Sequence, residues 1–302
     1  MEINTPASRP RPARLFTAFA LLLAALLVYN ANFRVISSGD NYPARYLPFA
    51  VLGYGTLNLD PIRGVVSQGR AQPYWIIQGK NGRIVSQYPV VAPLLVTPLY
   101  LPAVAWLHMR GWTDTRVDRL ARLMEKISAS IIASLSAALM YLLLLRRADA
   151  RTAMLLALAY AFGTNTWMIG SQGLWQHGTG ELLLTAGLLL VTGRCTIPRA
   201  LALGALCALA VFNRPPDAIL AAAIMLWSIV WAGRRFAAVL AGGAIPAALL
   251  LAYNLGVVGS VVGGYSIAMN AEFFHFSLPM GIAGLLFSLG RGLFVFTPFL
   301  PA

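Results

Sequence analysis

One carboxylate stands close behind the first long apolar run of the chain, in the stretch SSGDNYPARYLP at residues 37–48. Gly39 permits a tight turn before Asp40, and Pro43 and Pro48 stiffen the backbone that follows. A carboxylate fixed in this way can act as a general base, because it can take the proton of an attacking hydroxyl or amine. The alternative interpretation is a solvated aspartate in a polar turn.

A histidine and a glutamate follow at helical spacing in a second polar stretch, GTNTWMIGSQGLWQHGTGE at residues 163–181. His177 and Glu181 are four residues apart, so they share a face if a helix has begun by then. Such a pair could orient a phosphate or an acceptor hydroxyl, and ordinary helix-end polarity is the alternative. Trp167 and Trp175 are suited to the headgroup level of a membrane.

Two arginines stand where an anion could be bound: Arg214 in FNRPPD and Arg291 between two glycines in FSLGRGLFVF. Arginine keeps its charge in a low dielectric and binds phosphate through paired hydrogen bonds. Snorkelling toward the headgroups is the alternative for Arg214. The chain has no Walker-type phosphate loop, no HExxH and no GxSxG, which argues against a nucleotide-driven pump or a membrane protease.

Composition places these residues in a membrane protein. The chain is 58% hydrophobic and 11% charged, with a mean hydropathy of +0.69, which is typical of polytopic membrane proteins. The run at 15–33 follows the basic stretch RPRPAR and is long enough to cross a hydrocarbon core of about 30 Å. We predict an uncleaved anchor with a cytoplasmic N-terminus. A cleaved signal peptide is the alternative, but bulky residues occupy the place of a small-x-small cleavage site.

The net charge of +13 comes almost wholly from arginine. In a membrane protein such residues collect in cytoplasmic loops, so we expect no nucleic-acid partner. The two cysteines, Cys195 and Cys207, have no metal-ligand spacing.

The remaining apolar runs lie at 89–108, 124–145, 152–170, 178–193, 200–213, 218–233, 236–255 and 280–302. The run at 89–108 contains Pro93, Pro98 and Pro102, each of which removes a backbone donor that lipid cannot replace. If this run crossed, the basic turns at 146–151, 193–199 and 232–235 would face outward, against the positive-inside bias. We therefore predict that it is a surface-lying or re-entrant piece of one long outer loop, and that the basic turns are cytoplasmic.

This topology gathers a set of ionisable side chains on the outer side of the membrane. The set comprises Asp40, His177, Arg214, Asp217, Tyr265, Glu272 and His275. An enzyme that acts at the outer leaflet needs such a group.

Six stretches spread over nearly the whole chain carry a family resemblance. They are SSGDNYPARYLPFAVL, SQYPVVAPLLVTPLYLP, AFGTNTWMIGSQGLWQHG, FNRPPDAIL, YNLGVVGSVVGGY and GLLFSLGRGLFVFTPFL. Together they resemble the GT-C superfamily of membrane glycosyltransferases, which use sugars linked to polyprenyl phosphate. Within that superfamily the chain resembles proteins similar to bacterial protein O-mannosyltransferases and lipid A aminoarabinose transferases.

The resemblance implies a first outer loop that carries juxtamembrane helices and a catalytic carboxylate, which by position is Asp40. It also implies basic residues that hold the donor phosphate near the outer face, for which Arg45, Arg214 and Arg291 are the candidates. We take His177, Glu181 and Tyr265 as candidates to orient donor or acceptor. Many relatives have a second acidic residue in the next outer loop. Here that loop offers only Gln and His before Glu181, so no metal site is predicted and metal dependence stays open.

The predicted fold is all-α, a polytopic transmembrane bundle. Its parts are a basic cytoplasmic N-terminus (1–14), a first transmembrane helix (15–33), an outer loop with amphipathic or re-entrant helices (34–120) and a helical bundle (121–302). The chain ends soon after Gly292, so we expect a truncated relative of the family.

The predicted function is transfer of a sugar from a polyprenyl-phosphate donor to a lipid, glycan or protein acceptor at the outer face of the inner membrane. A transporter or flippase for a lipid-linked or small anionic solute is the main rival, and a non-catalytic membrane subunit is the other. A transporter would bury charges within its spans, whereas the charges here stand at span ends.

Overall fold

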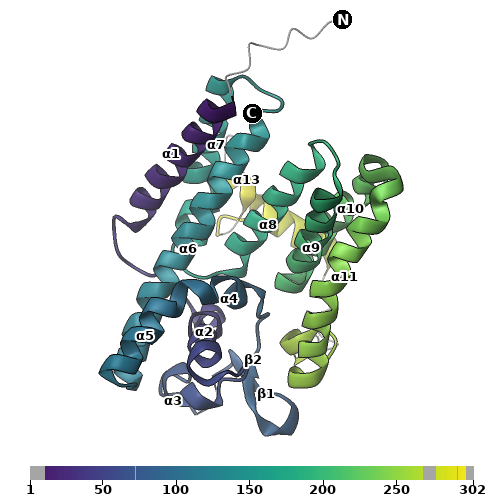
Figure 1. Ribbon diagram of the computed structural model, residues 1–302. Coiled ribbons are helices and arrows are strands. Elements are labelled where there is room, and N and C mark those ends of the chain that lie inside the picture. The colour runs from purple at the N-terminus through teal and green to yellow at the C-terminus, as the bar shows by residue number, and fades with distance from the viewer. Residues whose placement is uncertain (1–10, 72, 268–276, 291, 297–302) are drawn as a thin grey trace, which may run out of the picture. The chain divides into compact units, whose positions relative to one another are not determined.

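The computed structural model describes residues 11–71, 73–267, 277–290 and 292–296 (Figure 1). The chain divides into two compact units, a first unit of residues 1–264 and a second unit of residues 265–302. Helices predominate in the described residues, which confirms the helical part of the predicted fold class. The strands β1 (Ile76–Gln78) and β2 (Ile84–Ser86) form one antiparallel ribbon in which Ile77 lies opposite Val85.

The helices of the first unit follow the predicted apolar runs, with further helices between 42 and 110. They are α1 (Arg11–Asn30), α2 (Tyr42–Tyr54), α3 (Arg63–Val66), α4 (Val91–Val96), α5 (Leu101–Arg110), α6 (Asp114–Leu144), α7 (Ala150–Gly163), α8 (Gln176–Val191), α9 (Ile197–Asn213), α10 (Ala218–Ala232) and α11 (Phe236–Tyr253). The second unit contains α12 (Leu278–Phe287) and α13 (Leu293–Phe296), where the rings of Phe287 and Phe294 lie 5.5 Å apart.

Capping residues explain where several helices begin and end. Helix α6 starts ten residues before its apolar run because the Thr113 hydroxyl accepts a hydrogen bond from the backbone N–H of Arg116. Asp149 caps α7 in the same way. Gly55 ends α2 with a positive φ of 64°, a conformation that glycine adopts without strain.

Helix α6 is the central element of the first unit. Figure 1 shows α1 beside its C-terminal half, and α2, α3 and α5 beside its N-terminal half. The contact with α1 is a seam of small and aromatic residues in which Ala25 and Tyr29 pack on Ala133. Helix α6 thus links the apolar bundle to the segment 34–110.

The backbones of helices α9 and α11 pack directly against each other. A side chain on Gly204 would meet the backbone of α11 at Val239, and one on Gly242 would meet the backbone of α9 at Leu201. The two glycines therefore allow the two backbones to touch, as small residues commonly do between membrane helices.

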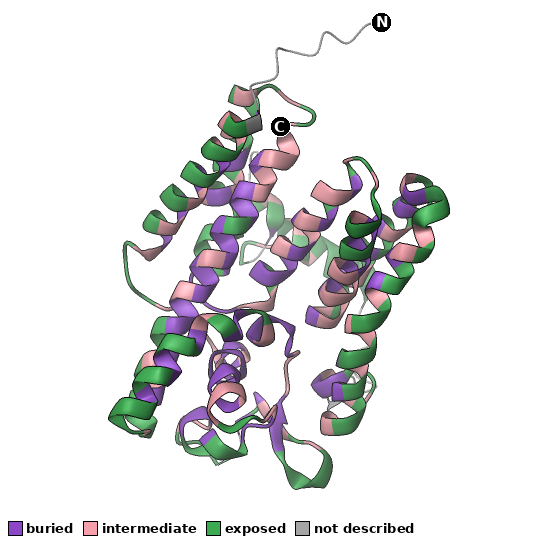
Figure 2. Cartoon of the chain, in the orientation of Figure 1, coloured by how far each residue is buried: buried purple, intermediate pink, exposed green. Residues whose placement is uncertain are grey.

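The segment 34–110 has a core of its own. Helix α2 is buried on every side from Pro43 to Ala50, and Phe49 packs edge-on against Tyr100 at 5.2 Å. Figure 2 shows this burial as purple on α2, in contrast to the green outer faces of α1, α10 and α11. Helix α2 is therefore a core helix of this segment, and the predicted outer loop with amphipathic or re-entrant helices stays a prediction.

Four helical segments are long and apolar enough to cross a membrane, among the described residues. They are Pro12–Asn30, Val91–Arg110, Asp114–Leu144 and Pro215–Val258, the last of which contains α10 and α11. Large apolar side chains such as Phe16, Trp227 and Val230 are exposed on them, as expected of surfaces that face lipid. These helices mark the chain as a membrane protein.

The segment Val91–Arg110 is not one regular helix. It consists of α4, a tighter turn over Thr97–Tyr100, and α5, with Pro98 and Pro102 at the first positions of the two later pieces. Its prolines thus fall mostly where a missing N–H does no harm. Its length and composition suit a crossing, so the surface-lying or re-entrant arrangement stays a prediction.

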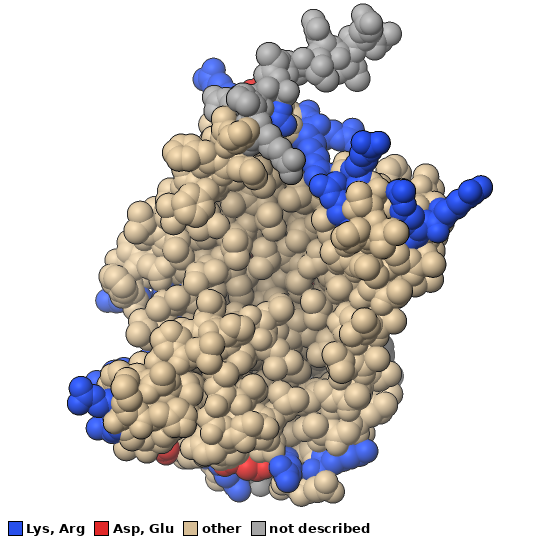
Figure 3. All heavy atoms as spheres, viewed as in Figure 1, with Lys and Arg blue, Asp and Glu red and all other residues tan. Residues whose placement is uncertain are grey.

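The basic turns lie together at one end of the first unit. Trp231 Nε1 donates to the carbonyl of Gly193 at 2.6 Å, Arg235 donates to that of Cys195 at 2.9 Å, and Arg146 bonds to Thr192. On the face drawn in Figure 3, most blue atoms gather at the two ends and uncharged atoms fill the belt between them.

Candidate functional site

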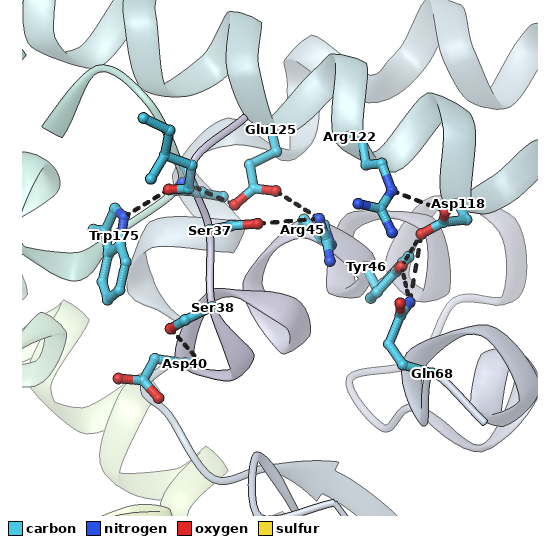
Figure 4. Close-up of polar contacts among 12 residues, drawn as sticks. Ser37, Ser38, Asp40, Arg45, Tyr46, Gln68, Asp118, Arg122, Glu125 and Trp175 are labelled. Atoms are coloured by element: carbon cyan, nitrogen blue, oxygen red, sulfur yellow. Dashed lines mark hydrogen bonds and ion pairs between the residues drawn. The ribbon is translucent and has the colours of Figure 1, made fainter. Parts of the chain in front are cut away.

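The turn that carries Asp40 is attached to the turn between α7 and α8. The backbone N–H of Ile36 donates to the carbonyl of Gln172 at 2.8 Å, and Trp175 Nε1 donates to the carbonyl of Ile36 at 3.2 Å (Figure 4). Inside its own turn, Asp40 donates its N–H to the Ser38 hydroxyl at 3.3 Å. The two polar stretches singled out in the sequence are therefore in direct contact.

Two tyrosine hydroxyls fix the Asp40 carboxylate. Tyr74 and Tyr88, which flank the β1–β2 ribbon, donate to its Oδ1 at 2.8 and 2.7 Å. Burial and the hydrogen bond to Asp40 raise the pKa of Tyr74, so this phenol keeps its proton and remains a donor at neutral pH. Asp40 is half-buried, and no described residue donates to its Oδ2. The carboxylate is thus held by one oxygen, which leaves the other for an incoming group.

Glycine at position 39 makes this arrangement possible. A Cβ atom there would meet the hydroxyl of Tyr74 and the ring of Trp75. Gly39 thus lets the Tyr74 hydroxyl come close enough to reach the carboxylate of Asp40.

His177 and Arg214 lie on the same side as Asp40. His177 is in the first turn of α8, where Arg214, Asp217 and Asp40 all act on it electrostatically. Arg214 follows the last residue of α9 and its Nη1 donates to Asp217 Oδ1 at 2.8 Å. The arginine side chain remains one-third exposed while Asp217 is buried, so Arg214 is accessible from solvent.

Glu181 lies one turn further along α8, and its contacts are with the bundle. Its Oε2 accepts hydrogen bonds from Thr166 at 3.0 Å and Tyr160 at 3.3 Å. Asp217 reaches the same helix, because a Cβ on Gly180 would meet its Oδ2. The structure therefore places Glu181 among hydroxyls of the bundle, beside the site but without a contact to Asp40.

The other predicted site residues have different places. Arg45 is fully buried and paired with Glu125, so it has no free surface for a phosphate. Tyr265 is half-buried and begins the second unit, in a short helical turn over Gly263–Ile267. Arg291 lies outside the described residues, as do Glu272 and His275.

Three residues of this region were not found by sequence reasoning. Tyr74 and Tyr88 gave no signal, because their approach to Asp40 depends on how the ribbon folds. Glu125 did give one, since it stands with Lys126 at the start of an apolar run, where an ionisable residue is a reason to look for a partner.

A cavity of about 260 Å³ adjoins the Asp40 carboxylate through Tyr88, which lines it. Its other walls are mainly apolar and come from the end of α9, the start of α10 and the end of α11; Phe212, Ala218, Leu250 and Tyr253 are among them. The Tyr253 hydroxyl is buried and has no hydrogen-bond partner among the described residues. The cavity suits an apolar group with a polar end.

Fold and site together define a class: a helical membrane protein with a fixed, half-buried carboxylate at one end of its helices. No group of His, Cys, Asp and Glu that could hold a metal ion occurs in the described part of the chain. No family model matches the chain, and neither a curated protein nor a solved structure matches it.

Proposed function

We propose that the chain is a membrane glycosyltransferase that uses a polyprenyl-phosphate sugar as its donor. The observation that supports this most is the Asp40 carboxylate, held through Oδ1 by two phenols beside His177 and Arg214. Asp40 is the general base of the proposed reaction. The resemblance to GT-C glycosyltransferases supplies the reaction class.

In the proposed reaction an acceptor O–H or N–H attacks the anomeric carbon of the donor from the face opposite the phosphate. Asp40 Oδ2 takes the proton as the new bond forms, and the bond from the anomeric carbon to the phosphate oxygen breaks. The products are the glycosylated acceptor, with inverted configuration, and free polyprenyl phosphate. The acceptor supplies the electron pair of the new bond, and the electron pair of the broken bond leaves with the phosphate oxygen, so no redox step is needed.

Arg214 is the residue best suited to the departing phosphate. Its guanidinium is partly exposed, and its position is fixed by Asp217. A charged hydrogen bond from such a group stabilises the negative charge that grows on the leaving oxygen. The cavity lined by Tyr88 has room for an apolar part of donor or acceptor next to the base. The acceptor is a lipid, a glycan or a protein, and the site is proposed to face outward from the inner membrane, with the N-terminus in the cytoplasm.

One observation favours a second candidate, a transporter or flippase. Glu181 is bonded to hydroxyls of the bundle, and an ionisable residue among membrane helices commonly marks a transport path. In this case the chain would move a lipid-linked or small anionic solute without breaking a bond.

One reconstitution experiment separates the two candidates. Purified protein in liposomes is incubated with radiolabelled polyprenyl-phosphate mannose and extracted membrane acceptors, and with a fluorescent short-chain polyprenyl phosphate whose movement between leaflets is followed. We expect label to appear in the acceptor fraction and free polyprenyl phosphate to form in equal amount. If the fluorescent lipid moves between leaflets faster than in protein-free liposomes and no sugar is transferred, the flippase is the better proposal.

A further inference from the structure

A second carboxylate, that of Glu125 on α6, contacts both segments from which the candidate site is built (Figure 4). Its Oε2 accepts a hydrogen bond from Arg45 Nη1 at 3.0 Å, and its Oε1 accepts one from the backbone N–H of Leu174 at 3.1 Å. Arg45 stands five residues after Asp40, and Leu174 stands three residues before His177. One side chain therefore joins the base to the turn that leads into α8.

Arg45 extends this link around the Asp40 turn. The same Nη1 atom approaches the Ser37 hydroxyl at 3.3 Å, and the guanidinium stacks on the ring of Tyr42 at 4.1 Å. Ser37 and Tyr42 lie on either side of Asp40 in the sequence, so the arginine holds the turn before and after the base. Arg45 and Glu125 are both fully buried, which makes the pair costly to break at one partner only.

We propose that Glu125, acting through Arg45, is a positioning residue that sets the direction of the Asp40 carboxylate relative to His177 and Arg214. This inference rests on the proposed function. Replacing both partners of a buried ion pair by uncharged residues of similar volume often leaves stability unchanged. A pair that serves only the fold is thus dispensable as a whole, whereas a positioning pair is not, and this difference can be measured.

The test compares Glu125→Gln with the double variant Glu125→Gln/Arg45→Met. Glutamine keeps an acceptor oxygen for the N–H of Leu174 but leaves the Arg45 charge unpaired, so the single variant should melt at a clearly lower temperature. The double variant removes that charge and should recover most of the melting temperature. Its single-turnover transfer from radiolabelled polyprenyl-phosphate mannose should nevertheless stay roughly 10- to 100-fold below wild type, the size expected when a reacting group is misplaced.

Two readouts separate positioning from a general loss of fold. The KM for the donor should change less than kcat, because neither residue reaches the donor. Arg122→Gln is the matched control: it breaks an ion pair with Asp118 on the same helix, where Arg122 is 49% exposed, and should leave both values unchanged. If the double variant melts as low as Glu125→Gln, the single variant Arg45→Lys replaces the double variant in the transfer assay. Lysine keeps the positive charge opposite Glu125 but lacks the planar set of donors of arginine.

A double variant with a restored melting temperature and wild-type turnover would overturn the inference. The same holds if Arg122→Gln loses as much turnover as the double variant. Hydrogen exchange of the purified protein tests the link without any activity. We expect faster exchange at 36–48 and 172–177 in the double variant and unchanged exchange in the basic turn at 146–151. If wild-type protein transfers no sugar, the proposed function fails, and unchanged exchange at 36–48 would then reject the positioning role separately.

Discussion

Two arginines at one end of the first unit bond to a backbone carbonyl and a hydroxyl, whereas two arginines near Asp40 each pair with a carboxylate. In the turns that lead into α7, α9 and α11, Arg235 donates to the carbonyl of Cys195 and Arg146 to Thr192. Beside Asp40, Arg45 is paired with Glu125 and Arg214 with Asp217. The first group is typical of solvated basic turns that orient a protein in the membrane. The second group is typical of a site in which charged side chains are held in place by partners.

The difference shows that a basic composition alone does not locate function in a membrane protein. The same residue type occurs at both ends, and only its partners distinguish the two. An arginine whose position is set by a buried carboxylate is oriented before any ligand arrives, whereas an arginine on a turn has to be ordered by the ligand itself. Variants at the two ends should therefore behave differently.

The largest contrast is expected between Arg214→Ala and Arg235→Ala. Loss of a charged hydrogen bond to the phosphate should weaken donor binding by about 1.5–3 kcal/mol in the Arg214 variant. Arg235 lies at the opposite end and should give wild-type affinity. Equilibrium binding of radiolabelled polyprenyl-phosphate mannose to both purified variants makes the comparison, and equal affinities would assign Arg214 to snorkelling.

A smaller effect is expected from Gly39→Ala, because the added methyl group would meet Tyr74 and Trp75. Tyr74 should move off the carboxylate, with a loss of about 1–3 kcal/mol of stability and a slower transfer step. Gly163→Ala serves as the control, since nothing lies within 4 Å of a Cβ at that position. Thermal unfolding and single-turnover transfer measured side by side would show the coupling, and a normal transfer rate in Gly39→Ala would argue against the importance of the Tyr74 contact.

Tyr88→Phe should have a still smaller effect. It removes one of the two hydrogen bonds on Asp40 Oδ1, and a loss of about 1 kcal/mol corresponds to roughly fivefold in turnover. Tyr54→Phe, on an exposed tyrosine at the end of α2, should change nothing. A Tyr88→Phe protein with full turnover would show that the second phenol is not needed to hold the base.

The smallest functional effect is expected for surface cysteines that report the orientation of the two ends. In a background lacking Cys195 and Cys207, Arg234→Cys should change stability by about 0.5 kcal/mol or less, because its position is exposed. Asp60→Cys should cost about 1 kcal/mol, because it loses the hydrogen bond from the backbone N–H of Ile84. An impermeant maleimide added to intact cells should label position 60 and reach position 234 only after permeabilisation. The reverse pattern would contradict the predicted topology.

Much of the helical framework could be predicted from the sequence, because apolar runs and capping residues are local signals. The first ten residues of α6 could not be found in this way, since Val117 and Ala121 face the core from a segment that is otherwise polar. Helix α2 had no predicted boundaries within the outer loop, because its burial depends on Tyr100 and other residues that are distant in the sequence.

The site was predictable where it depended on which end of a helix a residue occupies. The alternation of apolar runs put Asp40, His177 and Arg214 on one side, and in the structure Asp40 and Arg214 both act electrostatically on His177. Arg45 shows the limit of such reasoning. Its sequence position suited a phosphate, but its charge is taken up by Glu125, which is 80 residues away in the chain. A pairing at that separation depends on tertiary packing and leaves no local pattern.

The most direct test of the account is single-turnover sugar transfer by Asp40→Asn and Asp60→Asn in the same membranes. Asparagine at position 40 retains the size of aspartate but cannot accept the acceptor's proton, so transfer should fall by about a hundredfold or more, with donor binding and melting temperature little changed. Asp60 accepts a hydrogen bond from the backbone N–H of Ile84 at 3.0 Å, which asparagine can also accept, so its variant should transfer at nearly the wild-type rate. An Asp40→Asn protein that transfers sugar as fast as wild type would contradict the account and leave Asp40 as part of a polar turn.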